Sequence, residues 1–387
     1  MDSAFIYGHY VSGKNFIGRH KDVDVLVNLI SSRENIALVS TPKGGKTSLL
    51  QQAFFKIKTT APNFAVCEID LRSIRDLKAF LRIFGDAVIR QFAGTQPEYR
   101  EIVGKYLQGT HFVFDSRSFA EDSLIISPNW EPDEKDIRAL MNLPYLLSAS
   151  AEKQTVMVLR QFQDIRFIEK WEELCHILED IIKEQDSMLG RPYFSIVATG
   201  SMPNAMDEIF RHRRFFYRQF EQFTPSSIDE KDICESIVKG FLSSGKVIDR
   251  GLLQGVVLRL KGDMHHINHF FAICDQISKG YINENVLIDA LENLIAIHES
   301  SFNSIMEDLT NYQVNLLRAI CDGHTKFSSA EVIRSYNLSS SANVKRLKDA
   351  LAKKEIIIFS ENDDARFEDP LFEYWVKKYF FRTKVLF

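Results

Sequence analysis

The feature that most constrains the fold of this chain is a glycine- and lysine-rich segment at residues 40–47, Ser-Thr-Pro-Lys-Gly-Gly-Lys-Thr. It follows an apolar run at 35–39 and opens a stretch at 47–58 without proline or glycine, so it lies between an expected strand and an expected helix. In such a loop, adjacent glycines let backbone N–H groups turn inward, and the helix N-terminus adds partial positive charge. The segment therefore predicts a polyphosphate-binding loop (P-loop) in an α/β fold.

The P-loop motif assigns a role to each of its residues. Lys46 would reach the β- and γ-phosphates, and the Thr47 hydroxyl would ligate Mg²⁺. Ser40 replaces the first glycine of the GxxxxGK[ST] pattern, but a small residue can make the same tight turn. A lysine-rich surface turn is the alternative, and the flanking strand and helix favour the P-loop. The expected nucleotide contacts here are Thr41, Pro42, Lys43, Gly44, Gly45, Lys46, Thr47 and Ser48.

Alternating patterns predict an α/β first part. Further strands are expected at 63–70, 155–159 and 193–198, each separated from the next by helical periodicity. Pro144 is expected to end or kink the helix that precedes the second of these strands. The pattern indicates βαβ units and a parallel sheet covered on both faces by helices.

Beyond residue 225 the strand signals disappear. A capping-box sequence at Ser227 opens an all-helical region, and three short helices followed by a hairpin, from Tyr312 onward, outline a winged helix. The predicted fold is an α/β P-loop NTPase followed by a helical lid domain and a C-terminal winged helix. The expected domains are residues 1–225 (P-loop, with an irregular insertion at about 98–133), 226–308 (lid) and 309–387 (winged helix).

Composition narrows the function classes. The net charge of -4 and the pI of about 6.2 give no global electrostatic case for binding nucleic acid or an anionic membrane. The five cysteines form no CxxC pair, so neither a disulfide framework nor a zinc ribbon is indicated. No basic leader precedes an apolar stretch, and no apolar run approaches the length of a membrane span. We expect a cytoplasmic protein with no membrane partner.

Four segments carry a resemblance to a known family: Phe-Ile-Gly-Arg at 16–19, the P-loop, Val-Ala-Thr-Gly-Ser at 197–201 and Asp-Pro-Leu-Phe at 369–372. Together they resemble the archaeal-type ATPase family of the STAND branch of AAA+ proteins. The resemblance spans about residues 14–378 and implies an ATP- or ADP-binding core and a switch function. It would place Gly18 and Arg19 near the adenine and Ser201 near the γ-phosphate. It would also place Arg218 at a phosphate or a neighbouring subunit.

One departure from the family concerns catalysis. Its third strand normally ends in two acids, one supporting Mg²⁺ and one activating the attacking water, but Arg160 and Gln161 stand here. A guanidinium cannot ligate a cation, and a carboxamide can orient a water but cannot accept its proton. Loss of a positioned base costs roughly 10²–10⁴ in rate, so we expect weakened Mg²⁺ binding and slow or absent hydrolysis. Asp70 and Asp164 are candidate substitutes, and direct contact of Arg160 with the phosphates is an alternative.

Three functions follow. The leading one is an ATP- or ADP-binding STAND-type switch whose winged helix contacts a protein partner. The others are an active ATPase that uses another carboxylate, and a winged-helix DNA-binding regulator with a vestigial P-loop domain. Lys345, Arg346 and Lys348 suit DNA phosphates, but the acidic wing tip would repel them. The residues at that tip are Glu361, Asp363 and Asp364.

A histidine cluster in the expected lid is a weaker signal. His265 and His269 are one helical turn apart, with His266 between them. No third ligand such as a nearby cysteine or glutamate is evident. We therefore interpret the three as solvent-facing or lid-packing side chains.

Overall fold

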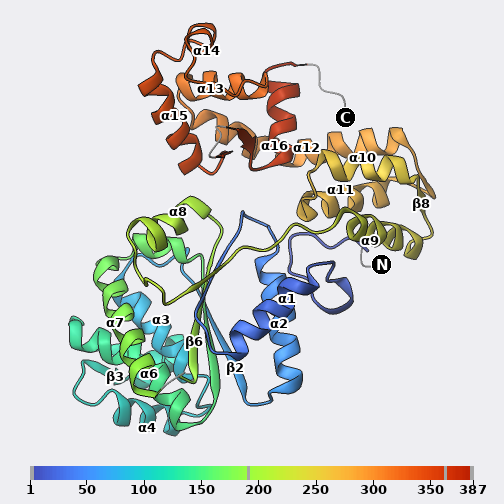
Figure 1. Ribbon diagram of the computed structural model, residues 1–387. Helices are drawn as coiled ribbons and strands as arrows, with labels where there is room; N and C mark the ends of the chain where they lie inside the picture. Colours follow the sequence, from blue (N-terminus) through green and yellow to red (C-terminus); the bar gives the residue numbers. More distant parts are fainter. Residues whose placement is uncertain (1–3, 190–191, 361–363, 384–387) are drawn as a thin grey trace. The chain divides into compact units, whose positions relative to one another are not determined.

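The chain forms two compact units. The computed structural model describes residues 4–189, 192–360 and 364–383 (Figure 1). One unit is His20–Ser226, and the other joins the described parts of Met1–Arg19 and Ser227–Phe387. Each unit has its own hydrophobic core. The N-terminal segment therefore packs with the carboxyl-terminal half: Phe5 is buried, with its ring 4.7 Å from that of Phe241.

The P-loop unit is built on a five-stranded parallel sheet of order β2-β5-β6-β1-β7. The strands are β1 (Ile36–Val39), β2 (Phe64–Asp70), β5 (Gln154–Arg160), β6 (Phe194–Gly200) and β7 (Glu221–Phe223). All seven residues of β6 are buried, as expected for a central strand covered on both faces. The predicted α/β P-loop class is confirmed.

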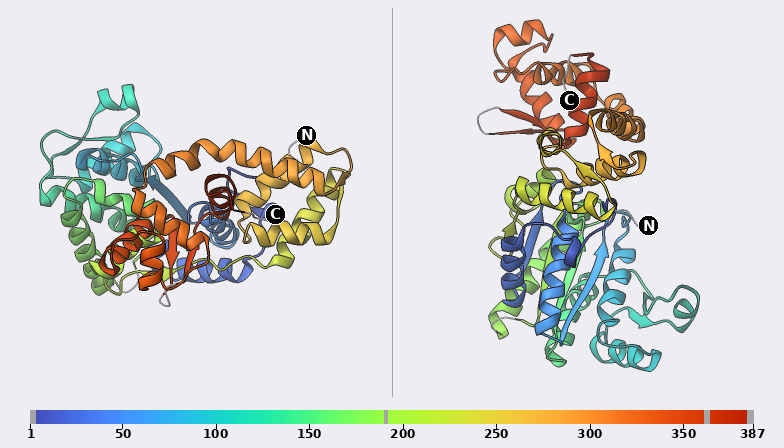
Figure 2. Two further views of the ribbon diagram at one scale, coloured as in Figure 1. Left: turned by 90° about the horizontal axis from the view of Figure 1, so that it is seen from above. Right: turned by 90° about the vertical axis from the view of Figure 1, so that its right-hand side faces the viewer.

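Helices cover both faces of this sheet (Figures 1 and 2). In Figure 1, α1 and α2 lie on one side, and α3, α6 and α7 lie on the other. The bounds are α1 (His20–Ser31), α2 (Lys46–Thr60), α3 (Leu77–Ile89), α6 (Glu134–Ser150) and α7 (Trp171–Leu189). The expected end of the helix at Pro144 is absent, because α6 runs through this residue. The buried neighbours Leu143, Tyr145 and Leu147 hold the segment in the core and outweigh the lost N–H.

Residues 98–133, for which the sequence predicts irregular structure, contain regular elements. They are most of α4 (Gln96–Tyr106), β3 (Phe112–Phe114), α5 (Ser116–Asp122) and β4 (Ile126–Pro128), with β3 and β4 antiparallel. Asp86 on α3 accepts the backbone N–H groups of Ile125 (3.0 Å) and Ile126 (3.2 Å), which ties the insertion to the unit. The elements are too short to produce a clear periodic pattern.

The second unit begins with the helical lid. Its helices are α9 (Glu230–Ser243), α10 (Arg250–Arg259), α11 (Met264–Ile277) and α12 (Glu284–Glu307). The expected all-helical region also contains a short parallel pair, β8 (Val247–Ile248) and β9 (Tyr281–Ile282). No helix in the described ranges is long and apolar enough to cross a membrane.

Three helices and a hairpin, as the sequence predicts, are followed by a fourth short helix in this unit. They are α13 (Asn311–Cys321), α14 (Ala330–Ser335), α15 (Ser341–Lys353), β10 (Ile357–Phe359), β11 (Ala365–Phe367) and the following α16 (Pro370–Trp375). Glu361 and Asp363 of the expected wing tip lie outside the described residues. Shorter elements in the chain are η1 (Gly13–Asn15), η2 (Phe162–Phe167), α8 (Pro203–Asp207), η3 (Glu208–His212) and η4 (Val376–Phe380). The three-domain boundaries remain a prediction.

Candidate nucleotide-binding site

The P-loop leaves the sheet at the carboxyl end of β1. The chain runs from β1 to the distant edge strand β2, while β6 and β7 lie on either side of β1. Ligands of open parallel sheets bind at such a point, beyond the carboxyl ends of the strands. Strand register aligns Leu38, Thr199, Arg160 and Asp70 across β1, β6, β5 and β2. Residues that follow these positions therefore meet at one edge of the sheet.

The backbone of the P-loop explains both adjacent glycines. Gly45 has φ 83° and forms the N-cap of α2. A Cβ on Gly44 would lie 2.6 Å from Ser40 Oγ and 3.0 Å from the Thr41 carbonyl oxygen. Lys43 also has a positive φ, of 60°. One glycine is thus required by its backbone conformation and the other by the close approach of the preceding turn.

The ammonium group of Lys46 binds back to the first two residues of the P-loop. Its Nζ donates to the carbonyl oxygens of Ser40 and Thr41, each at 2.8 Å, and lies 3.1 Å from Ser40 Oγ. The serine that replaces the first motif glycine therefore supplies two of these three contacts, one of them through its side-chain hydroxyl. The positive charge is in place at the start of α2, where the helix N-terminus adds to it.

Gln161 and Ser201 come together across the sheet edge. Gln161 follows β5 with φ 55°, and its Oε1 accepts hydrogen bonds from Ser201 Oγ at 2.6 Å and Gln163 Nε2 at 2.9 Å. The residue at the expected base position is thus oriented by the serine expected to sense the γ-phosphate. It presents a neutral carboxamide, which cannot take up a proton from water.

Arg160 is directed towards β2. Its Nη1 lies 3.8 Å from Glu68 Oε2, and Glu68 also accepts a hydrogen bond from Gln51 on α2. Glu68 and Asp70 lie on the same face of β2, because side chains two apart in a strand share a face. A guanidinium therefore occupies the region where the family has a metal-supporting acid.

Asp70, the first candidate substitute, is bound by Arg72. Arg72 Nε lies 3.0 Å from Asp70 Oδ1, and Nη2 lies 2.6 Å from Oδ2. Burial raises the pKa of Asp70. The hydrogen bonds and charge of Arg72, with a contribution from Arg160, lower this pKa by more than burial raises it. Its pKa is therefore below the usual value, and its carboxylate is committed to an arginine.

Asp164, the second candidate, lies on η2. Burial raises its pKa, and the nearby Asp70 adds to this, while Arg75 and Arg166 act in the opposite direction. Of the ligands that the resembled family would offer to Mg²⁺, the chain keeps the Thr47 hydroxyl, and Arg160 stands at the end of β5 in place of the carboxylate. The residues present fit Mg²⁺ poorly, because the remaining carboxylates lie among arginines.

Three further residues of the expected site are not part of the P-loop itself. Gly18 and Arg19 belong to the second unit, where a Cβ on Gly18 would approach Ile228 Cγ2 to 2.9 Å. Arg218 precedes β7, and the neighbouring Gln219 accepts a hydrogen bond from Asn35 at the start of β1. Arg218 is therefore at the edge of the sheet opposite the P-loop. The structure does not bring it to the phosphate-binding loop of its own chain.

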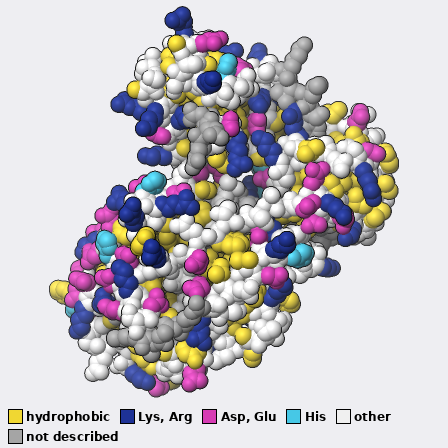
Figure 3. Space-filling model, in the orientation of Figure 1, with side chains coloured by type: hydrophobic (Ala, Val, Ile, Leu, Met, Phe, Trp, Pro, Cys, Tyr) yellow, Lys and Arg dark blue, Asp and Glu magenta, His cyan; other side chains and the backbone are white. Residues whose placement is uncertain are grey.

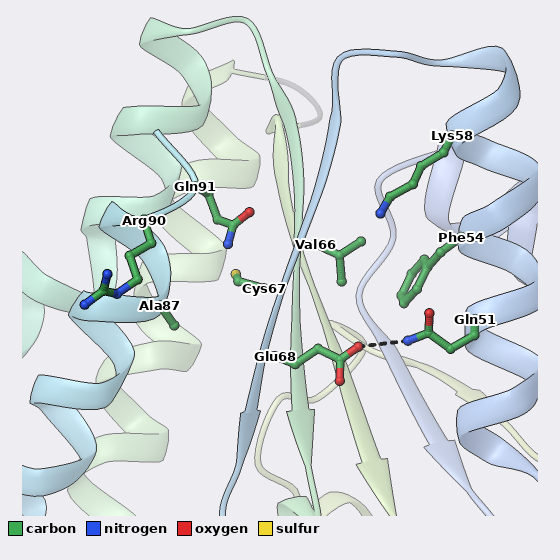
Figure 4. Close-up of a pocket in the computed structure, with 9 residues that line it drawn as sticks. All are labelled: Gln51, Phe54, Lys58, Val66, Cys67, Glu68, Ala87, Arg90 and Gln91. Carbon is green, nitrogen blue, oxygen red and sulfur yellow. Dashed lines mark hydrogen bonds between the residues drawn. The ribbon is translucent and has the colours of Figure 1, made fainter. Parts of the chain in front are cut away.

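A pocket of about 400 Å³ lies along the edge strand β2, between α2 and α3 (Figure 4). Its lining includes Phe54, Lys58, Glu68 and Arg90, and none of its nine residues belongs to the P-loop. It shares Glu68, the partner of Arg160, with the sheet edge described above and does not include the P-loop.

Sequence reasoning missed Glu68, Arg72 and Gln163. The alternation of strand residues could have placed Glu68 beside Asp70, whereas nothing local identifies the other two.

Comparison with solved structures identifies the fold. The Walker-type ATPase of Pyrococcus abyssi matches with a TM-score of 0.65 and 14% identity, over 96% of this chain and 99% of that chain. The ORC2 protein of Aeropyrum pernix matches in its ADP form, with a TM-score of 0.57 and 11% identity over 95% of this chain and 93% of that chain. Its ADPNP–ADP complexes match with a TM-score of 0.54 and 12% identity over 93% of both chains.

Comparison of sequences adds the carboxyl-terminal part. A family model described as "Probable winged helix domain" matches residues 300–378. No curated protein sequence matches this chain. The chain therefore has the fold of archaeal-type Walker ATPases and AAA+ P-loop proteins, with a C-terminal winged helix.

Proposed function

We propose that this protein is an ATP- or ADP-binding switch of the STAND type that hydrolyses ATP slowly or not at all. The observation that carries this proposal is the neutral carboxamide of Gln161, which follows β5 and is hydrogen-bonded to Ser201. The residue before it, Arg160 at the end of β5, is a cation. An attacking water could be oriented here but has no carboxylate to accept its proton. Nucleotide binding without turnover suits a switch.

The P-loop supports nucleotide binding. Residues 41–48 would hold the phosphates through inward-turned backbone N–H groups and the Lys46 ammonium, which supply positive potential to a polyphosphate. The Aeropyrum pernix ORC2 protein, which shares this fold, has been solved in an ADP form and in ADPNP–ADP complexes. Adenine nucleotides are therefore the ligands to test first.

The expected Mg²⁺ dependence is weak. The guanidinium of Arg160 replaces the metal-supporting acid, and Asp70 is paired with Arg72. The cationic side chains near the sheet edge can neutralise phosphate charge that Mg²⁺ neutralises elsewhere. Competent hydrolysis through Asp164 is the second candidate function, favoured by the position of η2 directly after Gln161.

Calorimetric titration of ATP and ADP, with and without Mg²⁺, tests the proposal. A hydrogen bond to a charged group is worth about 1.5–3 kcal/mol, so Lys46→Ala should weaken binding by about 10- to 150-fold. Lys58→Ala is the matched control, because this lysine lies on the same helix but lines the β2 pocket. Equal affinity of wild type and Lys46→Ala, or no binding at all, would leave the P-loop unit as a scaffold.

For the winged helix, we propose contact with a protein rather than with DNA. On α15, the Lys348 ammonium lies 5.0 Å from the Phe359 ring centroid, and just beyond the helix Lys354 donates to the Asp308 carbonyl at 3.1 Å. Both lysines therefore already contact groups of their own chain, which leaves them less available to bind DNA phosphates. On the face shown in Figure 3, basic and acidic side chains are interspersed. Duplex binding that weakens steeply with salt would support the DNA-binding alternative instead.

The compartment remains part of the proposal. All five cysteines are free thiols in the structure. Free thiols are typical of a reducing cytoplasm, where we expect this switch to act.

A further inference from the structure

Four histidines meet in the core of the second unit. His265, His266 and His269 lie on α11, and His298 lies on α12. The ring centroids of His266 and His298 are 5.5 Å apart, and those of His265 and His266 are 5.3 Å apart. The sequence around these three histidines offers no further cysteine or glutamate as a metal ligand. His298, more than thirty residues away along the chain, supplies one.

We propose that His265, His266 and His298 bind a divalent transition-metal ion of the zinc class. Their ligand nitrogens all lie within 4.8 Å of one another. Zn–N bonds of about 2.0–2.1 Å in a tetrahedron place two nitrogens about 3.3 Å apart, so small side-chain rotations complete the site. Three imidazoles suit zinc and its neighbours rather than Mg²⁺ or Ca²⁺, which prefer oxygen ligands. A water molecule would take the fourth position.

The carboxylate of Asp369 contacts one of these ligands, His266, through its other ring nitrogen. His266 Nε2 lies 3.1 Å from Asp369 Oδ1, which leaves Nδ1 as the nitrogen that His266 turns to the ion. A carboxylate that accepts the outer N–H of an imidazole orients it and raises its basicity.

The proposed ion would join three elements of the second unit. His265 and His266 begin α11, His298 lies on α12, and Asp369 caps α16 by accepting the backbone N–H groups of Leu371 (2.8 Å) and Phe372 (3.1 Å). Metal binding would therefore fasten lid helices to the last helix of the winged-helix region. His265 and His298 are only partly buried, which gives an ion a route into the site.

Two other groups of side chains are explained without a metal. His269 is stacked on Tyr7, with ring centroids 4.0 Å apart, so packing accounts for it. His111, Asp133 and Asp136 also lie close together in the first unit. There, Asp136 accepts the backbone N–H groups of His111 (2.8 Å) and Asp133 (2.9 Å) and lies 2.7 Å from His111 Nδ1. The bond to Asp133 belongs to the capping box of α6, the contacts with His111 tie the preceding segment to it, and the cluster is a structural one.

The test is titration of the chelator-treated full chain with Zn²⁺, followed by calorimetry, and with Co²⁺, followed by visible absorption. We expect one equivalent of Zn²⁺ and an intense tetrahedral Co²⁺ spectrum. His265→Gln and His298→Gln should each weaken Zn²⁺ binding by at least about 10-fold, and Asp369→Asn by about 10- to 100-fold. His111→Gln is the matched control and should change neither signal.

Partly exposed ligands are chosen for replacement so that the variants fold, which circular dichroism checks. The proposal is overturned if folded His298→Gln binds Zn²⁺ as tightly as wild type. It is equally overturned if wild type binds no Zn²⁺ or gives only the weak spectrum of octahedral Co²⁺. None of these readouts involves nucleotide, so the result is independent of the proposed switch function.

Discussion

Replacing both residues after the buried part of β5, in the double variant Arg160→Asp/Gln161→Glu, should convert slow or absent hydrolysis into measurable ATPase activity. The local geometry is already suited to a carboxylate at position 161. Ser201 Oγ and Gln163 Nε2 donate to Gln161 Oε1 at 2.6 and 2.9 Å, and the carboxylate would accept both bonds. The change adds a proton acceptor without moving the strand.

The magnitude follows from the missing base. A positioned general base contributes roughly 10²–10⁴ in rate, or about 2.7–5.4 kcal/mol of activation free energy. The double change also removes the half-exposed Arg160–Glu68 pair, worth at most about 1 kcal/mol. It places a new carboxylate beside Asp70, which costs about 1 kcal/mol in a water-like dielectric. A loss of about 2 kcal/mol leaves a domain of ordinary stability folded.

The assay is phosphate release under saturating ATP and Mg²⁺, with thermal unfolding to check the fold. Gln161→Glu alone separates the effect of the base from that of the charge at position 160. Adding Lys46→Ala to the double variant should abolish the gained activity. The reasoning is refuted if wild type already releases phosphate as fast as the double variant. A folded, nucleotide-binding double variant that gains less than about tenfold would refute it equally.

Three further perturbations test other parts of the structure. Gly44→Ala should weaken nucleotide binding in calorimetry, because the new Cβ would meet Ser40 Oγ at 2.6 Å. The control Gly255→Ala, on α10 with open space around this position, should instead raise the melting temperature slightly. Asp70→Asn should lower the free energy of unfolding by less than about 1 kcal/mol at neutral pH. Since the folded-state pKa of Asp70 lies below the usual 3.8, this stabilisation is present above that pH, and the difference between variant and wild type should vanish in denaturant titrations as pH falls through the folded-state pKa. Phe5→Ala should destabilise the second unit by about 3–5 kcal/mol in chemical unfolding, because this ring is buried against Phe241; an unchanged transition would show that the N-terminal segment does not belong to that core.

Local patterns were enough to predict the P-loop and the elements around it. The apolar run before Ser40, the two glycines and the uninterrupted helical stretch after Thr47 each act over a few residues, and the structure has β1, the loop and α2 there. The hairpin of the winged helix is likewise set by neighbouring residues. Short elements in the 98–133 insertion escaped prediction, because three-residue strands carry almost no periodicity.

Contacts between distant segments could not be predicted in this way. The hydrogen bond from Ser201 to Gln161 crosses 40 residues and depends on the pairing of β5 with β6. Strand register also decides the position of Arg218, which the family resemblance would bring to a phosphate or a neighbouring subunit and which lies before the amino end of β7. His298 joins its cluster only through the packing of α12 on α11.

The replacement of two acids by Arg160 and Gln161 changes which ions the sheet edge can hold. Arg160 and Arg72 stand opposite Glu68 and Asp70, so the carboxylates that might attract Mg²⁺ are already balanced by guanidinium groups. Lys46 remains as the cation bound to the loop itself. A polyphosphate brings its own negative charge to this arrangement, whereas a divalent cation would have to compete with arginines that stay protonated. This balance of charges supports the proposal that the site holds a nucleotide with little help from Mg²⁺.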